Sequence, residues 1–156
     1  MASDPKRNDS LDLLTEQLRL APALTPALML DVVAKACVRL SALTQAGKTA
    51  RFFRLIEDDA WSDAALALIE LEAPAWTLRR LICEDGEWLC SLTEQPYSPI
   101  AVDDTADASH SVLPLAILLA FLETRQRVAA AREARRPAEP QARAATAYVA
   151  CCDNFA

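Results

Sequence analysis

Glycine and histidine are among the residue types that this chain nearly lacks. Only two glycines occur among its 156 residues, while 53% of the residues are hydrophobic. Because alanine and leucine dominate, the composition is typical of a helix-rich globular domain of this length. His110 is the single histidine, so a Ser-His-Asp or Cys-His catalytic arrangement would have to include it. The scarcity of histidine therefore leaves little room for nucleophilic catalysis.

The chain also lacks a long apolar segment. Its longest apolar run, from Val112 to Leu122, is far shorter than the roughly 20 residues that a membrane span needs. Residues 1–10 are polar and mixed in charge, unlike a signal peptide. We therefore expect a cytoplasmic protein without a membrane partner, in which the five cysteines are reduced. Their odd number does not suggest a disulfide framework.

Charge is unevenly distributed along the chain. The net charge is −6, which disfavours nucleic acid and anionic membranes as partners. Residues 125–143 nevertheless hold six arginines against two glutamates, a local charge of +4 that leaves −10 for the rest. The basic segment is therefore a feature of one helix end and not of the whole molecule.

The stretch from Trp76 to Thr93 predicts one antiparallel β-hairpin, with strands at about 76–83 and 87–93. Asp85-Gly86 between them supplies the two positive-φ positions of a type I′ turn, which places Cys83 opposite Trp88. One face of this hairpin is predicted to carry Leu81, Cys83, Trp88, Cys90 and Leu92. The other face is predicted to carry Trp76, Leu78, Ile82 and Leu89. Because an isolated hairpin is marginally stable in water, helices must cover at least the first face.

Apolar spacing and capping residues predict helices on both sides of the hairpin in sequence. Their expected ranges are 11–20, 26–46 after the cap Thr25, 49–58, 63–72 and a helix from 112 that is apolar nearly all round. Residues 95–109 are expected to form a loop with at most one helical turn. The predicted fold class is α+β, with three to five helices packed around the hairpin. A single domain is expected over 10–136, with a hairpin–helix core at 62–128 and disordered ends at 1–9 and 137–156.

An acidic segment before the last helix is a candidate metal site. It contains Asp103, Asp104, Asp107 and His110. Carboxylates with one imidazole suit Mn, Mg or Zn, and a small metal-dependent enzyme would use these residues. Their spacing matches no closed structural site, and a solvated acidic loop is the simpler interpretation.

The arginine-rich helix end is a candidate interaction surface. It includes Arg125, Arg132, Arg135 and Arg136. Cations at a helix C-terminus complement the helix dipole, but they could also contact an acidic protein or nucleic acid, as in a nucleic-acid-binding accessory protein.

No catalytic, cofactor-binding or small-molecule site emerges from these patterns, so the leading prediction is a non-enzymatic interaction or regulatory module. The partner would be a second copy or another protein, because the face carrying Trp76, Leu78 and Ile82 and the hairpin edges would otherwise stay uncovered. Cys151 and Cys152 fall in the C-terminal tail and have no assigned role.

Three segments together resemble the small phage-type α-β-β-α sandwich domain. They are the helix Asp63–Glu72, the strand Trp88-Leu-Cys-Ser-Leu and the helix opening Leu113-Pro-Leu-Ala-Ile117. The resemblance covers about residues 62–128 and implies two helices against a hairpin. The chain is also similar to short uncharacterised proteins of Gram-negative bacteria, alphaproteobacteria among them. Neither group implies a catalytic residue.

Overall fold

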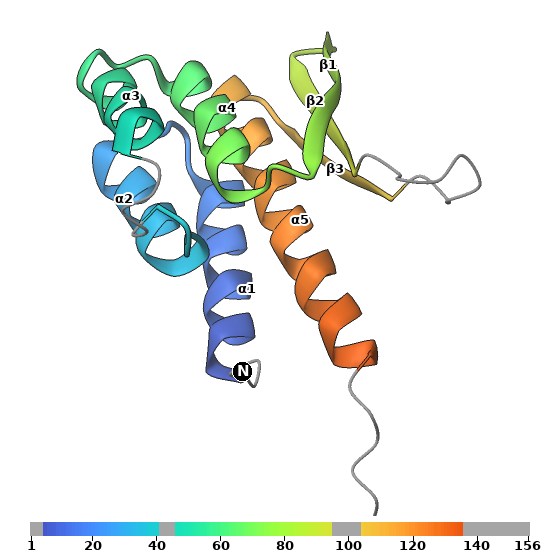
Figure 1. Ribbon diagram of the computed structural model, residues 1–156. Helices are drawn as coiled ribbons and strands as arrows, with labels where there is room; N and C mark the ends of the chain where they lie inside the picture. Colours follow the sequence, from blue (N-terminus) through green and yellow to red (C-terminus); the bar gives the residue numbers. More distant parts are fainter. Residues whose placement is uncertain (1–4, 41–45, 95–103, 136–156) are drawn as a thin grey trace, which may run out of the picture.

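The computed structural model describes residues 5–40, 46–94 and 104–135. In these ranges the chain forms five α-helices and three β-strands, which confirms the predicted α+β class (Figure 1). The helices are α1 (Pro5–Leu20), α2 (Pro26–Ala36), α3 (Ala46–Glu57), α4 (Trp61–Glu72) and α5 (Leu113–Ala134). The strands are β1 (Trp76–Glu84), β2 (Glu87–Glu94) and β3 (Thr105–His110), and they form one antiparallel sheet in the order β1-β2-β3. The helices lie to one side of this sheet. Among the described helices, none combines the length and apolar character needed to cross a bilayer.

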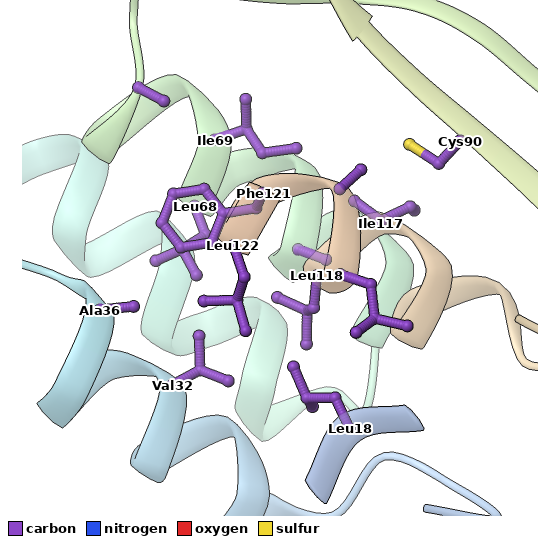
Figure 2. Close-up of a cluster of buried hydrophobic side chains, with 14 of the residues drawn as sticks. Leu18, Val32, Ala36, Leu68, Ile69, Cys90, Ile117, Leu118, Phe121 and Leu122 are labelled. Carbon is purple, nitrogen blue, oxygen red and sulfur yellow. The ribbon is translucent and has the colours of Figure 1, made fainter. Parts of the chain in front are cut away.

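The first half of α5 lies at the centre of the hydrophobic core. Every residue from Leu115 to Leu122 is buried, as expected for a helix that is apolar all round. The helix packs against β2, β3, α1 and α4. Figure 2 shows α5 side chains surrounded by residues of four other elements: Leu18, Val32, Ala36, Leu68, Ile69 and Cys90. The apolar surface of α5 is therefore used inside the domain, and no partner is needed to cover it.

The hairpin forms in the predicted register next to its turn. Cys83 lies opposite Trp88 and Leu81 opposite Cys90. The turn residues have the expected positive φ angles, 51° at Asp85 and 84° at Gly86. Two turn residues thus set the alignment of β1 and β2 from the turn as far as Arg80, which lies opposite Ser91.

A β-bulge at Arg79 overturns the predicted second face of the hairpin. The register shifts between Leu78 and Arg80, and the extra residue reverses the alternation of side chains in the first part of β1. Trp76 therefore shares the helix-covered face and is only 5% exposed, and Leu78 lies opposite Leu92 on the same side. The predicted grouping of Trp76 and Leu78 with Ile82 is wrong, so Trp76 belongs to the core and cannot form a surface for a second copy.

A third strand replaces part of the predicted loop. Thr105–His110 pairs with β2, with Ala108 opposite Cys90 and Ala106 opposite Leu92. Alanine and aspartate are depleted in strands, which is why this segment resembled a loop in the sequence. The small side chain of Ala106 is fully buried on the side of α5 and lets the helix lie close to the strand. The sheet consequently has β1 and β3 at its edges, and β2 lies between them.

Several helix boundaries differ from the sequence prediction. α1 begins at Pro5, so residues 5–9 are helical and not disordered, and proline suits the first turn of a helix. α2 starts at Pro26 with the predicted cap, in which the N–H of Leu28 donates to Thr25 Oγ1, but it ends at Ala36 instead of about residue 46. α3 begins at Ala46, before the predicted start at residue 49. The predictions for residues 1–4 and 137–156, including Cys151 and Cys152, fall outside the described ranges.

The early end of α2 is explained by a buried carboxylate on α4. Cys37 adopts an extended conformation, and the backbone N–H groups that follow turn toward Glu72. Val38 N donates to Glu72 Oε2 at 2.9 Å and Leu40 N to Oε1 at 2.5 Å. Glu72 is only 2% exposed, so its two oxygens replace water as acceptors for these groups. The carboxylate thereby joins the end of α2 to the end of α4.

Replacing Glu72 should destabilise the fold more than replacing any exposed carboxylate of α4. We expect Glu72→Ala to lower the free energy of unfolding by about 1–3 kcal/mol, since the part-buried N–H groups of Val38 and Leu40 lose their acceptor. Glu72→Gln, which keeps one acceptor oxygen, should cost less. Denaturant unfolding measures both, with Glu70→Ala at the exposed neighbouring position as the control. Equal midpoints for Glu72→Ala and Glu70→Ala would contradict this role.

Candidate functional site

A groove of about 520 Å³ follows β3 and is bounded by α1 and α5. Strand β3 contributes Asp107, Ala108, Ser109 and His110. α1 contributes Thr15 and Arg19, and α5 contributes Leu119, Glu123 and Gln126. Glu87 and Ser111 complete the lining near the turn end of the sheet. A volume of this size lies in the range of pockets that bind ligands.

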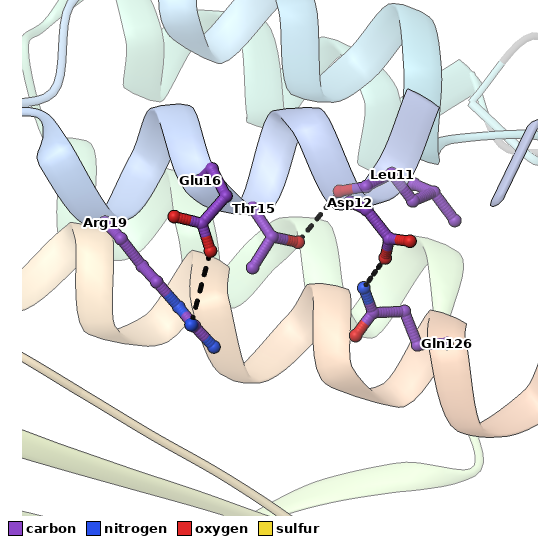
Figure 3. A network of polar contacts seen from close by, with 6 residues as sticks. All are labelled: Leu11, Asp12, Thr15, Glu16, Arg19 and Gln126. Atoms are coloured by element: carbon purple, nitrogen blue, oxygen red, sulfur yellow. Dashed lines mark hydrogen bonds and ion pairs between the residues drawn. The ribbon is translucent and has the colours of Figure 1, made fainter. Parts of the chain in front are cut away.

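The two helices beside the groove are held together by a polar bridge. Gln126 Nε2 of α5 donates to Asp12 Oδ1 of α1 at 2.8 Å, and Figure 3 shows the two side chains pointing toward one another. Thr15 and Arg19 follow Asp12 on the same helix, and Arg19 forms an ion pair with Glu16 at 3.4 Å. This exposed hydrogen bond adds to the packing of α1 against α5 beside the groove.

The outer edge of β3 carries unpaired backbone groups. Glu94 N donates to Asp104 O at 3.1 Å, and this bond fixes which residues of β3 turn toward β2. In an antiparallel ladder the hydrogen-bonded residues alternate, so Ala106, Ala108 and His110 also face β2. The N–H and C=O groups of Thr105, Asp107 and Ser109 consequently point away from the sheet. In the part of the chain that the structure describes, β3 pairs with β2 alone.

His110 anchors one end of this strand. Its Nδ1 accepts the N–H of Val112 at 2.9 Å, and its Nε2 lies 3.3 Å from the carbonyl oxygen of Arg19. A carbonyl oxygen only accepts, so the geometry assigns the neutral tautomer with hydrogen on Nε2. Both ring nitrogens are used to connect β3, the start of α5 and the end of α1. The histidine thus has a structural role beside the groove.

The predicted metal ligands are not brought together. Asp107 lies opposite Ser91 and His110 opposite Trp88, and their odd spacing along β3 places the two side chains on opposite faces of the sheet. Asp104 forms an ion pair with Arg127 at 3.8 Å. Within residues 5–40, 46–94 and 104–135, no group of three His, Cys, Asp or Glu side chains could hold a metal ion. Asp103 lies outside the described residues.

The arginine-rich helix end does not form one continuous basic surface. Arg125 is half-buried and its Nη1 lies 3.5 Å from the backbone oxygen of Glu72. Arg127 pairs with Glu123 at 3.0 Å, in addition to Asp104. Arg132 and Arg135 are exposed in the last turn, and Arg136 falls outside the described ranges. The arginines closest to the domain are thus engaged in contacts within it.

The groove itself carries an excess of negative charge. Its lining includes three carboxylates, those of Glu87, Asp107 and Glu123, and one guanidinium, that of Arg19. Glu123 is paired with Arg127, whereas Asp107 and Glu87 are exposed and have no ion pair among the described residues. Two carboxylates therefore remain available to a positively charged group at the sheet edge.

Sequence reasoning found Asp107 and His110 but assigned them to a metal site. The alternation of Thr105, Asp107 and Ser109 with small alanines was the only available sign of an edge strand. The position of α1 beside that strand leaves no mark in local sequence.

Comparisons of the chain with protein families, curated proteins and solved structures found no match. The interpretation of the site consequently depends on its geometry.

The cysteines of the described core are chemically protected. Burial raises the pKa of the Cys37 thiol to about 12, with a further contribution from the nearby Glu72 carboxylate. Burial, followed by the charge of Asp107, raises the pKa of Cys90 to about 11. Cys83 lies exposed on the hairpin. Since the thiolate is the reactive form, only the last of these three is open to modification at neutral pH.

Alkylation of the native protein should therefore distinguish these cysteines. We expect iodoacetamide at pH 8 to label Cys83 at least tenfold faster than Cys37 or Cys90, because burial and raised pKa values suppress their thiolates. Peptide mass mapping measures each site, and labelling in guanidinium gives the unprotected rates. Rapid labelling of Cys90 in the folded protein would contradict its buried position.

The same raised pKa values predict how the free energy of unfolding depends on pH. Because the folded pKa values of Cys37 and Cys90 exceed the ordinary 9.0, the free energy of unfolding should be unaffected by these thiols below pH 9 and should decline as pH rises toward 11–12.

Proposed function

We propose that this protein is a non-enzymatic interaction module that receives an extended segment of a partner protein as a fourth strand beside β3. The observation that carries the proposal is the row of outward backbone N–H and C=O groups at Thr105, Asp107 and Ser109, which borders the groove. Addition of a strand to a sheet edge is a recurrent mode of peptide recognition, in which backbone hydrogen bonds supply affinity.

Strand β3 is better suited to this role than β1, the other edge of the sheet. β1 contains the bulge at Arg79, and bulges interrupt regular pairing at an edge. β3 pairs with β2 without a register shift over its six residues, so its outer groups are regularly spaced. The groove along β3 also provides room for side chains of the added segment.

The alternative functions have weaker support. A metal-dependent enzyme would need Asp107 and His110 on one side of β3, whereas they alternate across the sheet. A nucleic-acid-binding protein would need a continuous group of cations to contact phosphates, whereas Arg127 is shared between two carboxylates and only Arg132 and Arg135 of the helix end are exposed and without an ion pair among the described residues. Self-association through the hairpin was predicted from an uncovered Trp76 face and from two free hairpin edges. In the structure Trp76 is buried, and β2 is paired on both sides. The oligomeric state itself stays a prediction.

Backbone pairing at β3 can be tested with a proline substitution. The probe is a short capped peptide of alternating valine and threonine, titrated into the full ¹⁵N-labelled chain. We expect the largest NMR shifts at the amides of Thr105, Asp107 and Ser109, with slower hydrogen exchange there. Ser109→Pro should weaken binding by about tenfold or more, because it removes one outward N–H while the inner ladder is kept.

Two control variants separate backbone pairing from other effects. Ser109→Ala removes the hydroxyl but keeps the N–H, so it should bind as the wild type does. Cys83→Pro removes an N–H that points outward from β1, because the residues next to the paired Glu84 and Glu87 face away from β2. It should leave binding unchanged. Unchanged melting temperatures confirm that the variants fold. The proposal would be refuted by NMR shifts confined to β1, or by the absence of NMR shifts at millimolar peptide.

A further inference from the structure

Resting on the proposed function, we infer that the partner segment is basic: an extended stretch with lysine or arginine opposite Asp107 and apolar residues on either side of it. The first ground is charge. Asp107 and Glu87 lie at the groove without ion pairs among the described residues, and the only guanidinium of the lining, that of Arg19, is paired with Glu16. An added strand with cationic side chains would neutralise both carboxylates, whereas an acidic one would be repelled.

The second ground is the alternation of side chains in a sheet. The residue directly opposite Asp107 would exchange backbone hydrogen bonds with it, and both side chains would lie on the same face, the face that no helix covers. That face is open to solvent at Asp107, as a charged pair requires. A lysine or arginine at this position would therefore form a cross-strand ion pair with the Asp107 carboxylate.

The neighbours of that basic residue would point the other way, toward the helices. There they would meet Leu119 of α5 and Thr15 of α1. Leu119 is buried, with only 5% of its surface exposed. Thr15 is half-buried, and its hydroxyl donates to the backbone oxygen of Leu11 at 2.8 Å within α1. Neither side chain offers a charge, and the charged lining residues of the two helices, Arg19 and Glu123, are already paired with Glu16 and Arg127. Apolar side chains therefore fit this part of the groove. The alternation apolar, basic, apolar thus follows from one edge strand and the helices behind it.

A second copy of this chain is disfavoured as the occupant. If two β3 strands paired antiparallel through all three of their outward-facing residues, Thr105 would lie opposite Ser109 and a two-fold axis would place Asp107 directly opposite Asp107 of the other copy. Like charges directly opposite one another destabilise a strand pair. The edge is therefore suited to a segment of a different protein, whose charge is opposite to that of Asp107.

Three capped peptides that differ at one position test the inference. Their common pattern is Thr-Val-X-Val-Thr, with lysine, glutamine or glutamate at X, and each is titrated into the full wild-type chain by NMR. We expect the lysine peptide to bind roughly fivefold more tightly than the glutamine peptide, and the glutamate peptide to bind most weakly. The difference between lysine and glutamine should shrink as salt rises, because the pair is exposed.

Charge variants of the protein locate the effect at Asp107. Asp107→Asn should bring the three affinities together, and Asp107→Lys should make the glutamate peptide the strongest. Glu70→Lys, which makes the same change in net charge on the exposed face of α4, should keep the wild-type order. This control separates a local ion pair from attraction by the whole molecule.

The outcomes separate the basic partner from strand addition itself. Equal affinities of the three peptides, with shifts still at Thr105 and Ser109, would overturn the inference and leave the proposed function standing. A lysine preference that Asp107→Lys does not reverse would overturn it as well. No binding of any peptide would overturn both. Sedimentation of the wild type over a dilution series completes the test: a dimer that Ser109→Pro dissociates would identify a second copy as the occupant and reject the inference.

Discussion

The complete burial of the first half of α5 is the constraint on which the rest of the fold depends. A helix without a polar face has to be covered all round, and here α1, α4 and the sheet cover it. This demand explains why β3 presents alanines toward α5 and why the helices gather on one side of the sheet (Figure 1). The opposite face of the sheet then carries Ile82 and Leu89 together with polar side chains such as Arg80 and Asp107. A single enclosed helix thus determines both the core and the surface that remains.

The hairpin and α5 were predictable because their signals are local. Asp85-Gly86 defines the turn, and the apolar run from Val112 defines a buried helix. The bulge at Arg79 was missed, although the consecutive Arg79 and Arg80 interrupt the alternation of β1 at the place where the extra residue enters. β3 was missed because its inward side chains are alanines, which resemble a loop or helix more than a strand. Glu72 appeared to be an ordinary last residue of a helix, and only tertiary structure gives its carboxylate two backbone donors.

The candidate site could be predicted only in part for the same reason. The sequence singled out Asp107 and His110, but it grouped them by closeness in the chain. A strand separates neighbours across its two faces, so the histidine joins three elements while the aspartate stays at the surface. The groove requires α1 beside β3, a contact between segments about ninety residues apart, as in the approach of His110 to Arg19. No local pattern encodes such an arrangement.

The two edges of the sheet differ, and this asymmetry limits stoichiometry. A sheet with two regular edges can grow in both directions, and such growth leads to open-ended assemblies. Here the bulge at Arg79 interrupts one edge, while the other is six residues long and borders α1. An incoming strand that occupies the β3 edge leaves, among the described strands, only the β1 edge, whose regular pairing the bulge interrupts. One extra residue in β1 would in this way help to keep any complex at one partner per molecule.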